Sequence, residues 1–300
     1  MKKLTLVLLG SVALAWNSHS EGLSERYAQY GELIVTQMVT APFPHPKRAE
    51  GHKYHEKLFT AKDSYSDNTV AIFIPKGFHQ SGQVDLVVHF HGWGNHVETV
   101  LKQYKLIEQL IASGRNAVLV VPQGPRDASD SFGGKLEDPE GFKRFIDEVT
   151  ATLRQQSSLK TQEFTIRNIL LSGHSGGYEV MSSIVDCGGL SDHVKEVWLF
   201  DALYAQADKF LAWQTNQQGR LLNIYTEHGG TKGETEQCMA TLRQRGVAYR
   251  FAGKAHTAKP AELQANEPIF LYTDLPHNDV LAKHETFRTF LETSCLGKRE

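Results

Sequence analysis

The sequence contains 300 residues, of which 34 are acidic and 32 are Lys or Arg, so the formal net charge is only −2 at pH 7. Dedicated nucleic-acid or anionic-membrane binders normally carry a basic face or stripe, and this near-balance without blocks of like charge argues against both classes. The length fits one large α/β domain or two small ones, with enough apolar residues to bury a sizeable core.

The N-terminus has the pattern of an export signal. A short basic start is followed by an apolar run over residues 4–15 and by possible cleavage sites after Ala15 or Ser20. The alternative is a membrane anchor, but the run is shorter than the ~20 residues needed to span a bilayer. We therefore expect residues 1–20 to be a signal peptide, the mature protein to be periplasmic or secreted, and no stable membrane anchor.

Export would make the cysteines candidates for a disulfide. The chain has three, Cys187, Cys238 and Cys295, so at least one thiol must stay free or join another molecule. Three buried, inert thiols are the equally open alternative, and the sequence does not identify a pair.

Residues 21–53 are predicted to form an N-terminal helix, over 22–39, and a Pro-rich connector, over 41–46. Apolar stretches at 54–60 and 69–75, separated by a turn-rich segment, predict an antiparallel hairpin. The continuous apolar run that follows at 84–90 is typical of a strand buried on both faces of a parallel sheet.

From residue 84 the pattern alternates between strands and helices. The predicted strands are 84–90, 117–122, 166–172, 194–200, 221–225, 247–251 and 268–273, and the predicted helices are 97–113, 139–156, 176–185, 207–213, 234–245 and 279–293. Repeated strand–helix units indicate one α/β domain, over 54–300, with a mostly parallel sheet covered by helices on both faces.

The strand at 166–172 runs directly into Gly173-His-Ser-Gly-Gly177, and a helical pattern follows. This is G-x-S-x-G in a strand–turn–helix context, where a sharp turn lifts a nucleophilic hydroxyl off the sheet and glycines keep neighbouring backbones from colliding. The alternative is an ordinary Gly/Ser-rich turn. The context favours Ser175 as a nucleophile, with the Gly176 amide facing a developing oxyanion at the helix start.

The strand at 84–90 ends in His91-Gly92-Trp93-Gly94. With the serine motif and the order of elements, this resembles the α/β-hydrolase superfamily over about residues 54–291, most nearly secreted esterases and polyester or feruloyl-ester hydrolases. The resemblance implies an α/β-hydrolase fold in which Trp93, the residue after His-Gly, donates its backbone N–H to the oxyanion. A Gly-rich turn packing an aromatic ring is the plainer alternative.

The superfamily places its triad in the order Ser, acid, His. The base is expected between the last strand and the last helix, where His277 lies, and His256 after another strand is the alternative. Most relatives would carry the acid after the strand at 221–225, where Glu227 is nearest, whereas some lipases carry it one strand earlier, where Asp201 follows an apolar strand. A carboxylate against a buried strand needs a partner, which favours Asp201.

Two other classes of protein compete with a serine hydrolase. His89, His91 and His96 have a spacing that can bind zinc, and alternate strand residues face the same side, but no acidic ligand follows at metallohydrolase spacing. A non-catalytic binding protein on this fold would typically have lost the serine or the histidine, and both are present. We expect no metal and no other cofactor.

The segment 201–220 has room for only one or two short helices, so no large cap domain is expected. The cleft should be open, with residues 22–53 able to fold over its mouth. Its predicted rim is Trp93, Tyr178, Tyr204 and Trp213, although each could be ordinary core and Trp213 most of all. The sequence thus predicts an exported serine hydrolase that cleaves a small-molecule or polymeric ester through an acyl-enzyme, with peptides and amides as alternative substrates.

Overall fold

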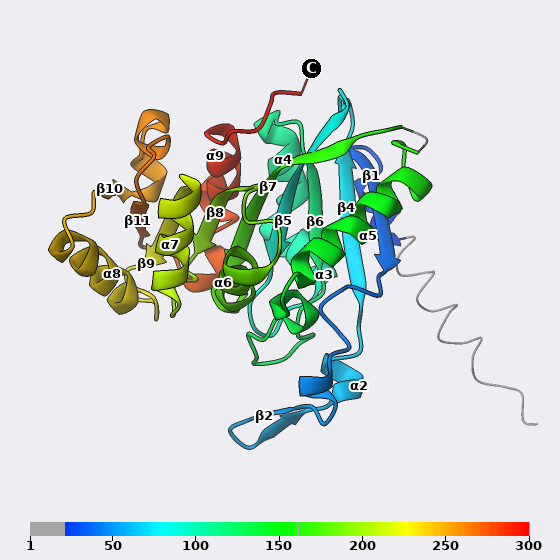
Figure 1. Ribbon diagram of the computed structural model, residues 1–300, viewed down its shortest axis with the longest axis horizontal. Coiled ribbons are helices and arrows are strands. Elements are labelled where there is room, and N and C mark those ends of the chain that lie inside the picture. The colour runs from blue at the N-terminus through cyan, green and yellow to red at the C-terminus, as the bar shows by residue number, and fades with distance from the viewer. Residues whose placement is uncertain (1–21, 161, 300) are drawn as a thin grey trace, which may run out of the picture.

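The computed structural model describes residues 22–160 and 162–299, so the predicted signal peptide lies outside the described residues. The strands of the central sheet are β1 Gly31–Gln37, β4 Thr69–Pro75, β5 Gln83–Phe90, β6 Val118–Pro122, β7 Thr165–His174, β8 Val194–Phe200, β9 Arg220–Thr226, β10 Arg250–Lys254 and β11 Ile269–Thr273. Their order across the sheet is β1-β4-β6-β5-β7-β8-β9-β11-β10 (Figure 1).

The sheet is mostly parallel, as predicted. Strand β4 is antiparallel to both of its neighbours, β1 and β6, and every pairing from β6 to β10 is parallel. Strands β4 and β6 are buried along their whole length, and β5 and β8 nearly so. Their continuous apolar sequences therefore reflect a sheet that is covered on both faces.

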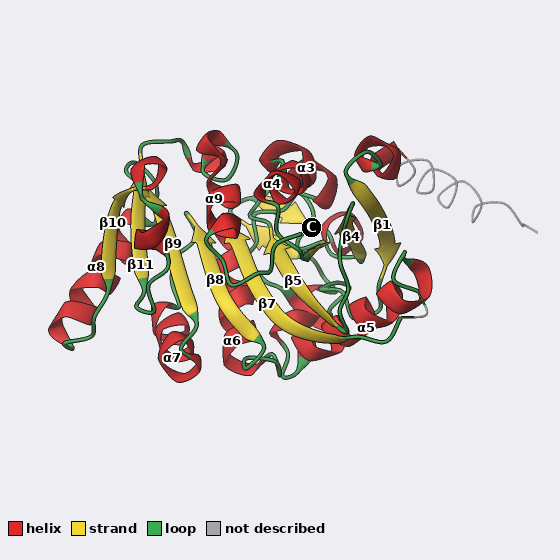
Figure 2. Ribbon diagram, turned by 90° about the horizontal axis from the view of Figure 1, so that it is seen from above, coloured by secondary structure: helices red, strands yellow, loops and turns green. Residues whose placement is uncertain are grey.

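Helices cover the two faces. Their bounds are α3 Val97–Tyr104, α4 Leu106–Ser113, α5 Gly141–Gln156, α6 Tyr178–Cys187, α7 Ala207–Gln217, α8 Lys232–Gln244 and α9 Thr286–Glu292. Helices α3, α4 and α9 lie on one face and α5 to α8 on the other (Figure 2), each face having its own apolar core. Among the described helices, none is both long and apolar enough to cross a membrane.

The predicted helix over 22–39 is wrong for most of its length. Residues 22–27 are helical, but Gly31–Gln37 forms β1, paired with β4 in a continuous antiparallel register. The β-branched residues Ile34, Val35 and Thr36 favour a strand once a partner is available, and β4 offers its free edge. The N-terminal segment thus belongs to the main sheet.

The predicted hairpin of 54–60 with 69–75 is also wrong. Strand β2, His52–Tyr54, pairs with β3, Lys57–Phe59, as a separate two-stranded sheet, and β4 pairs elsewhere. The Thr60 side chain accepts a hydrogen bond from the backbone N–H of Asp63 and caps α2, Ala61–Ser64, which ends the β3 strand. A small hydrophobic cluster anchors this hairpin to the body: Phe43, Phe59, Tyr65, Ala128 and Phe132.

Two long helices are broken. The predicted helix at 97–113 is interrupted at Lys105, which has a φ of 51°, and the Gln109 amide donates to the carbonyls of Tyr104 and Leu281 there. The predicted helix at 279–293 starts late, because 3-10 turns and irregular chain occupy its first half and α9 begins only at Thr286. The candidate disulfide is not formed: Cys187, Cys238 and Cys295 are free thiols.

Candidate active site

Ser175 stands on a strained turn at the end of the central strand β7. Its φ of 52° is unusual for a residue with a side chain, and a single 3-10 turn leads from it into α6. A Cβ on Gly173 would come within 2.3 Å of Met181 Sδ, and one on Gly177 within 2.6 Å of the Phe90 carbonyl oxygen. The glycines on both sides of the serine are therefore needed for close packing.

The His-Gly loop lies directly against this turn. A Cβ on Gly92 would come within 2.5 Å of Ser175 Cβ, so the loop backbone touches the serine. A Cβ on Gly176 would come within 2.8 Å of the Trp93 ring and 2.6 Å of Ser131 Oγ. The Trp93 indole donates to that hydroxyl at 2.8 Å. The fold thus gathers Trp93 and Gly176 beside Ser175.

His91 ties the loop to the end of β6. Its Nε2 accepts the backbone N–H of Gly124 at 2.9 Å, so its Nδ1 carries the proton and donates to the Gly92 carbonyl at 2.8 Å. Burial lowers the pKa of His91, although the bond to Gly92 opposes the shift. A neutral imidazole therefore fixes the direction of the Gly92 carbonyl, and with it the peptide N–H of Trp93.

The three histidines of the zinc alternative have separate partners. His89 Nδ1 pairs with Ser172 Oγ at 2.9 Å, and His96 Nδ1 pairs with Asp127 at 2.8 Å, while His91 binds the loop backbone. In the described part of the chain, no group of three or more His, Cys, Asp or Glu side chains could hold a metal ion.

Asp201 contacts His277, 76 residues further along the chain. Asp201 Oδ2 lies 2.5 Å from His277 Nδ1, and the carboxylate is fully buried at the end of β8. It also accepts hydrogen bonds from the Thr226 hydroxyl at 3.0 Å, the Thr226 backbone at 3.2 Å and the Thr231 hydroxyl. Burial raises the pKa of Asp201, but the bonds from His277, Thr231 and Thr226 outweigh it and lower the pKa below its usual value.

The alternative acid and base have other partners. Glu227 accepts a hydrogen bond from Lys232 at 2.6 Å and is about a third exposed. His256 is exposed on a short 3-10 turn, with its ring 4.8 Å from that of His284. The structure therefore brings Asp201, and not Glu227, to His277.

Two aromatic residues connect His277 with the serine. The His174 ring, next to Ser175 in sequence, lies 4.4 Å from the His277 ring. The Tyr204 ring is 6.5 Å from that of His277 and 6.0 Å from that of Tyr178. Burial raises the pKa of Tyr204, the charge of Asp201 adds to the rise, and a hydrogen bond with the Ser175 side chain opposes it. The contacts of Tyr204 thus join the serine and the histidine in one site.

The mouth of this site is open on the Trp93 side. Trp93 is 42% exposed, and Tyr54, from β2, packs its ring 5.0 Å away. Trp213 is only 3% exposed and lies in the core under α7, so its predicted place on the rim is wrong and the core alternative holds. Within the described segment 201–220, α7 is the one helix, and it packs on the sheet instead of forming a cap.

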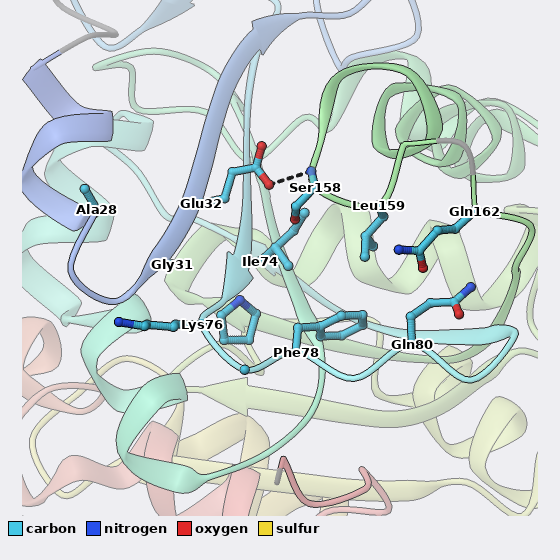
Figure 3. A pocket seen from close by; sticks show the side chains of 12 residues that line it. Ala28, Gly31, Glu32, Ile74, Lys76, Phe78, Gln80, Ser158, Leu159 and Gln162 are labelled. Carbon is cyan, nitrogen blue, oxygen red and sulfur yellow. Dashed lines mark hydrogen bonds between the residues drawn. The ribbon is translucent and has the colours of Figure 1, made fainter.

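Two hollows differ in their relation to the serine. A small one of about 20 Å³ adjoins Gly176 and is walled by residues including Phe132 and Val180. A groove of about 500 Å³ lies between the β1–β4 edge and the loop after α5, where Glu32 accepts the Ser158 backbone N–H at 2.7 Å (Figure 3). The groove contains none of the candidate site residues, so it is separate from the site.

Sequence reasoning missed several supporting residues. Thr226 and Thr231 hold Asp201, Ser131 holds the Trp93 indole, and Tyr104 bonds to His174. Only His174 had a sequence signal, because it occupies the variable position before the serine in the motif. The others lie in loops or helices whose approach to the site depends on tertiary packing.

No protein-family model and no curated protein sequence matches the chain. Several solved structures match its fold. A ferulic acid esterase matches with a TM-score of 0.53 at 11% identity over 87% of this chain and 99% of its own. The feruloyl esterase module of Clostridium thermocellum matches with a TM-score of 0.56 at 11% identity over 88% of both chains. A fluorophosphonate-binding serine hydrolase of Staphylococcus aureus matches with a TM-score of 0.50 at 12% identity over 88% of this chain and 99% of its own. The chain therefore has the α/β-hydrolase fold.

Proposed function

We propose that this protein is an exported serine hydrolase that cleaves carboxylic esters through an acyl-enzyme. Ser175 is the nucleophile, His277 the general base and Asp201 the acid that orients it, while the backbone amides of Trp93 and Gly176 bind the oxyanion. The observation that carries the proposal is the 2.5 Å contact between buried Asp201 and His277, beside a serine held at positive φ.

Each group has a defined step in this mechanism. Ionised Asp201 accepts a hydrogen bond from the Nδ1–H of His277, so Nε2 keeps a lone pair that takes the Ser175 proton during attack on the ester carbonyl. The two amides stabilise the tetrahedral oxyanion, and protonated His277 returns its proton to the leaving alcohol. A water activated by the same imidazole then releases the acid and regenerates the serine.

The substrate that fits best is an ester with a small acyl group on a large alcohol. The hollow next to Gly176 is about 20 Å³, room for little more than one water-sized or methyl-sized group. Trp93, whose indole donates to Ser131 on the wall of this hollow, is exposed, so a large or polymeric alcohol can extend past it into solvent. Two proteins of the same fold are named as feruloyl esterases, which supports ester chemistry in this architecture.

Export is part of the proposal and rests on the N-terminal pattern alone. A basic start and an apolar run over residues 4–15 precede the candidate cleavage sites. The intact mass of protein recovered from the periplasm or medium checks it: we expect the loss of about 15 or 20 residues, at Ala15 or Ser20. Full-length protein confined to the cytoplasm would contradict export and leave the catalytic proposal intact.

Labelling with a fluorophosphonate tests the catalytic proposal, because only an activated serine reacts. We expect one adduct, mapped to Ser175 by mass spectrometry, and hydrolysis of p-nitrophenyl acetate that Ser175→Ala lowers by up to ~10⁶ in kcat. Peptide and amide substrates are run beside the esters. A folded Ser175→Ala protein with wild-type ester turnover would refute the assignment, and faster cleavage of amides would replace the esterase with an amidase.

A further inference from the structure

We infer that His174, the residue before the nucleophile, is a positioning residue that holds the catalytic base in place. This inference rests on the proposed function, since it assigns to His174 the alignment of His277 with Ser175. His174 is 1% exposed, and its Nε2 lies 2.9 Å from the backbone carbonyl oxygen of His277. Its Nδ1 lies 3.0 Å from the hydroxyl of Tyr104, which is itself fully buried.

The partners fix the tautomer of this imidazole. A carbonyl oxygen can only accept a hydrogen bond, so His174 Nε2 carries the proton and donates a hydrogen bond to the backbone carbonyl oxygen of His277. Nδ1 is then an acceptor, and the Tyr104 hydroxyl donates a hydrogen bond to it. Both ring nitrogens are thus satisfied by groups from other elements, Tyr104 at the end of α3 and His277 in the loop after β11.

The base needs such a tether because its own loop is irregular. His277 begins a 3-10 turn of three residues between β11 and α9, and its side chain is about a third exposed. Asp201 holds the imidazole through Nδ1, and His174 holds the backbone through the carbonyl oxygen. Because His174 and Ser175 are consecutive, this second bond ties the loop of the base directly to the backbone of the nucleophile.

The charge state of His174 matters as well as its geometry. Its ring lies 4.4 Å from the His277 ring with an interplanar angle of 35°. Burial, followed by the proximity of His277, lowers the pKa of His174 to about 3. A second cation at this distance would oppose formation of the His277 imidazolium during the reaction, and a neutral His174 avoids that repulsion.

Paired substitutions test this role. His174→Leu fills the buried site with an apolar side chain and removes the hydrogen-bond donor. His174→Gln can still offer an amide N–H to the carbonyl oxygen of His277. Tyr104→Phe removes only the hydroxyl that bonds to Nδ1. The matched control is Ser172→Ala, on the same strand and equally buried, whose hydroxyl pairs with His89 and makes no contact with His277.

The assays are p-nitrophenyl acetate kinetics, the rate of fluorophosphonate labelling of Ser175, and thermal unfolding of each variant. We expect His174→Leu to lower kcat by about 10²-fold with KM unchanged, since a shift of about 1 Å in a catalytic group has this effect. His174→Gln should recover most of the loss, Tyr104→Phe should lose about threefold to tenfold, and Ser172→Ala should keep kcat within about twofold.

The result separates this inference from the proposed function. If the wild-type protein does not label at Ser175, the proposed function itself fails. If the wild type labels and folded His174→Leu reacts as fast, the positioning role of His174 is refuted. Equal losses of kcat in His174→Leu, His174→Gln and Ser172→Ala also overturn it. Such losses would come from a general loss of stability and not from the loss of the hydrogen bond to His277.

Discussion

Exchanging the carboxyl group of Asp201 for an amide is the sharpest test of the proposed triad. Asp201→Asn preserves the shape of the side chain but replaces one carboxylate oxygen with an NH2 group. His277 Nδ1 then faces either the amide oxygen or the NH2 group. Three other donors compete for the single oxygen: the Thr226 hydroxyl, the Thr226 backbone and the Thr231 hydroxyl. The amide therefore places an N–H against a donor or against the imidazole. In the second case His277 takes the wrong tautomer and loses the lone pair at Nε2.

The expected size of the effect follows from these contacts. Loss of the correct tautomer lowers kcat by about 10⁴-fold, or about 5 kcal/mol of transition-state stabilisation. Leaving one buried donor unpaired lowers the free energy of unfolding by about 1–3 kcal/mol. For the matched variant Glu227→Gln the ion pair with Lys232 is partly exposed, so we expect a stability change of at most about 1 kcal/mol and kcat within about twofold.

The assay is p-nitrophenyl acetate turnover at saturating substrate, with urea unfolding of the same preparations. KM should change little, because neither carboxylate is proposed to contact the substrate. Active Asp201→Asn together with crippled Glu227→Gln would refute the choice of acid and move the role to the end of β9. If both variants were fully active, the triad mechanism itself would be wrong.

Four further predictions follow from other parts of the structure. Gly92→Ala adds a Cβ within 2.5 Å of Ser175 Cβ and should lower kcat at least about 10²-fold. The control is Gly233→Ala in α8, whose Cβ would meet nothing within 4 Å; it should keep its activity and raise the free energy of unfolding by up to about 1 kcal/mol. Equal kcat values in the two variants would contradict the close approach of the loop to Ser175. The pKa of Asp201 lies below its unfolded value of about 3.9, so its ionised form stabilises the fold above that pH and the contribution is lost as pH falls through the folded pKa. Urea midpoints between about pH 6 and pH 3 should therefore decline more steeply in the wild type than in Asp201→Asn, and parallel curves would disprove the coupling. In the p-nitrophenyl series, kcat/KM should fall at least about tenfold from acetate to octanoate, and Val180→Ala should reduce this ratio by enlarging the hollow; undiminished octanoate cleavage would rule out the small acyl site. Glu196→Gln, at the opposite end of β8 from Asp201, weakens a buried ion pair with Arg220. It should lower the free energy of unfolding, measured by calorimetry, by about 3–5 kcal/mol and leave kcat, measured with p-nitrophenyl acetate, unchanged.

The central strands and the serine motif could be predicted from the sequence because their signals are local. Strand β8 has the predicted bounds, and the run of apolar residues that defines it ends at Asp201. The turn at Ser175 follows from glycines that the neighbouring strand and helix require. In each case the residues that determine the structure lie within a few positions of one another.

The N-terminal region could not be predicted because its structure depends on distant partners. Residues 31–37 become a strand through pairing with β4, about forty residues away, and that ladder outweighs a helical pattern of apolar residues. The break at Lys105 depends on Gln109 reaching Leu281 in the C-terminal region. The polar partners of Asp201 and His277 come from several loops that are far apart in the sequence. The spacing of residues in a single sequence does not show which of these loops meet in the fold.

The loop that follows β9 passes close to the carboxylate supplied by β8. A Cβ atom at Gly229 would stand 2.8 Å from Asp201 Oδ2 and 1.8 Å from Thr226 Oγ1. A side chain at residue 229 would therefore displace either the carboxylate or the Thr226 hydroxyl that donates to it. The geometry of the proposed triad thus depends on a residue that contributes no side chain, and a change at Gly229 should disturb the acid as surely as a change in one of its donors.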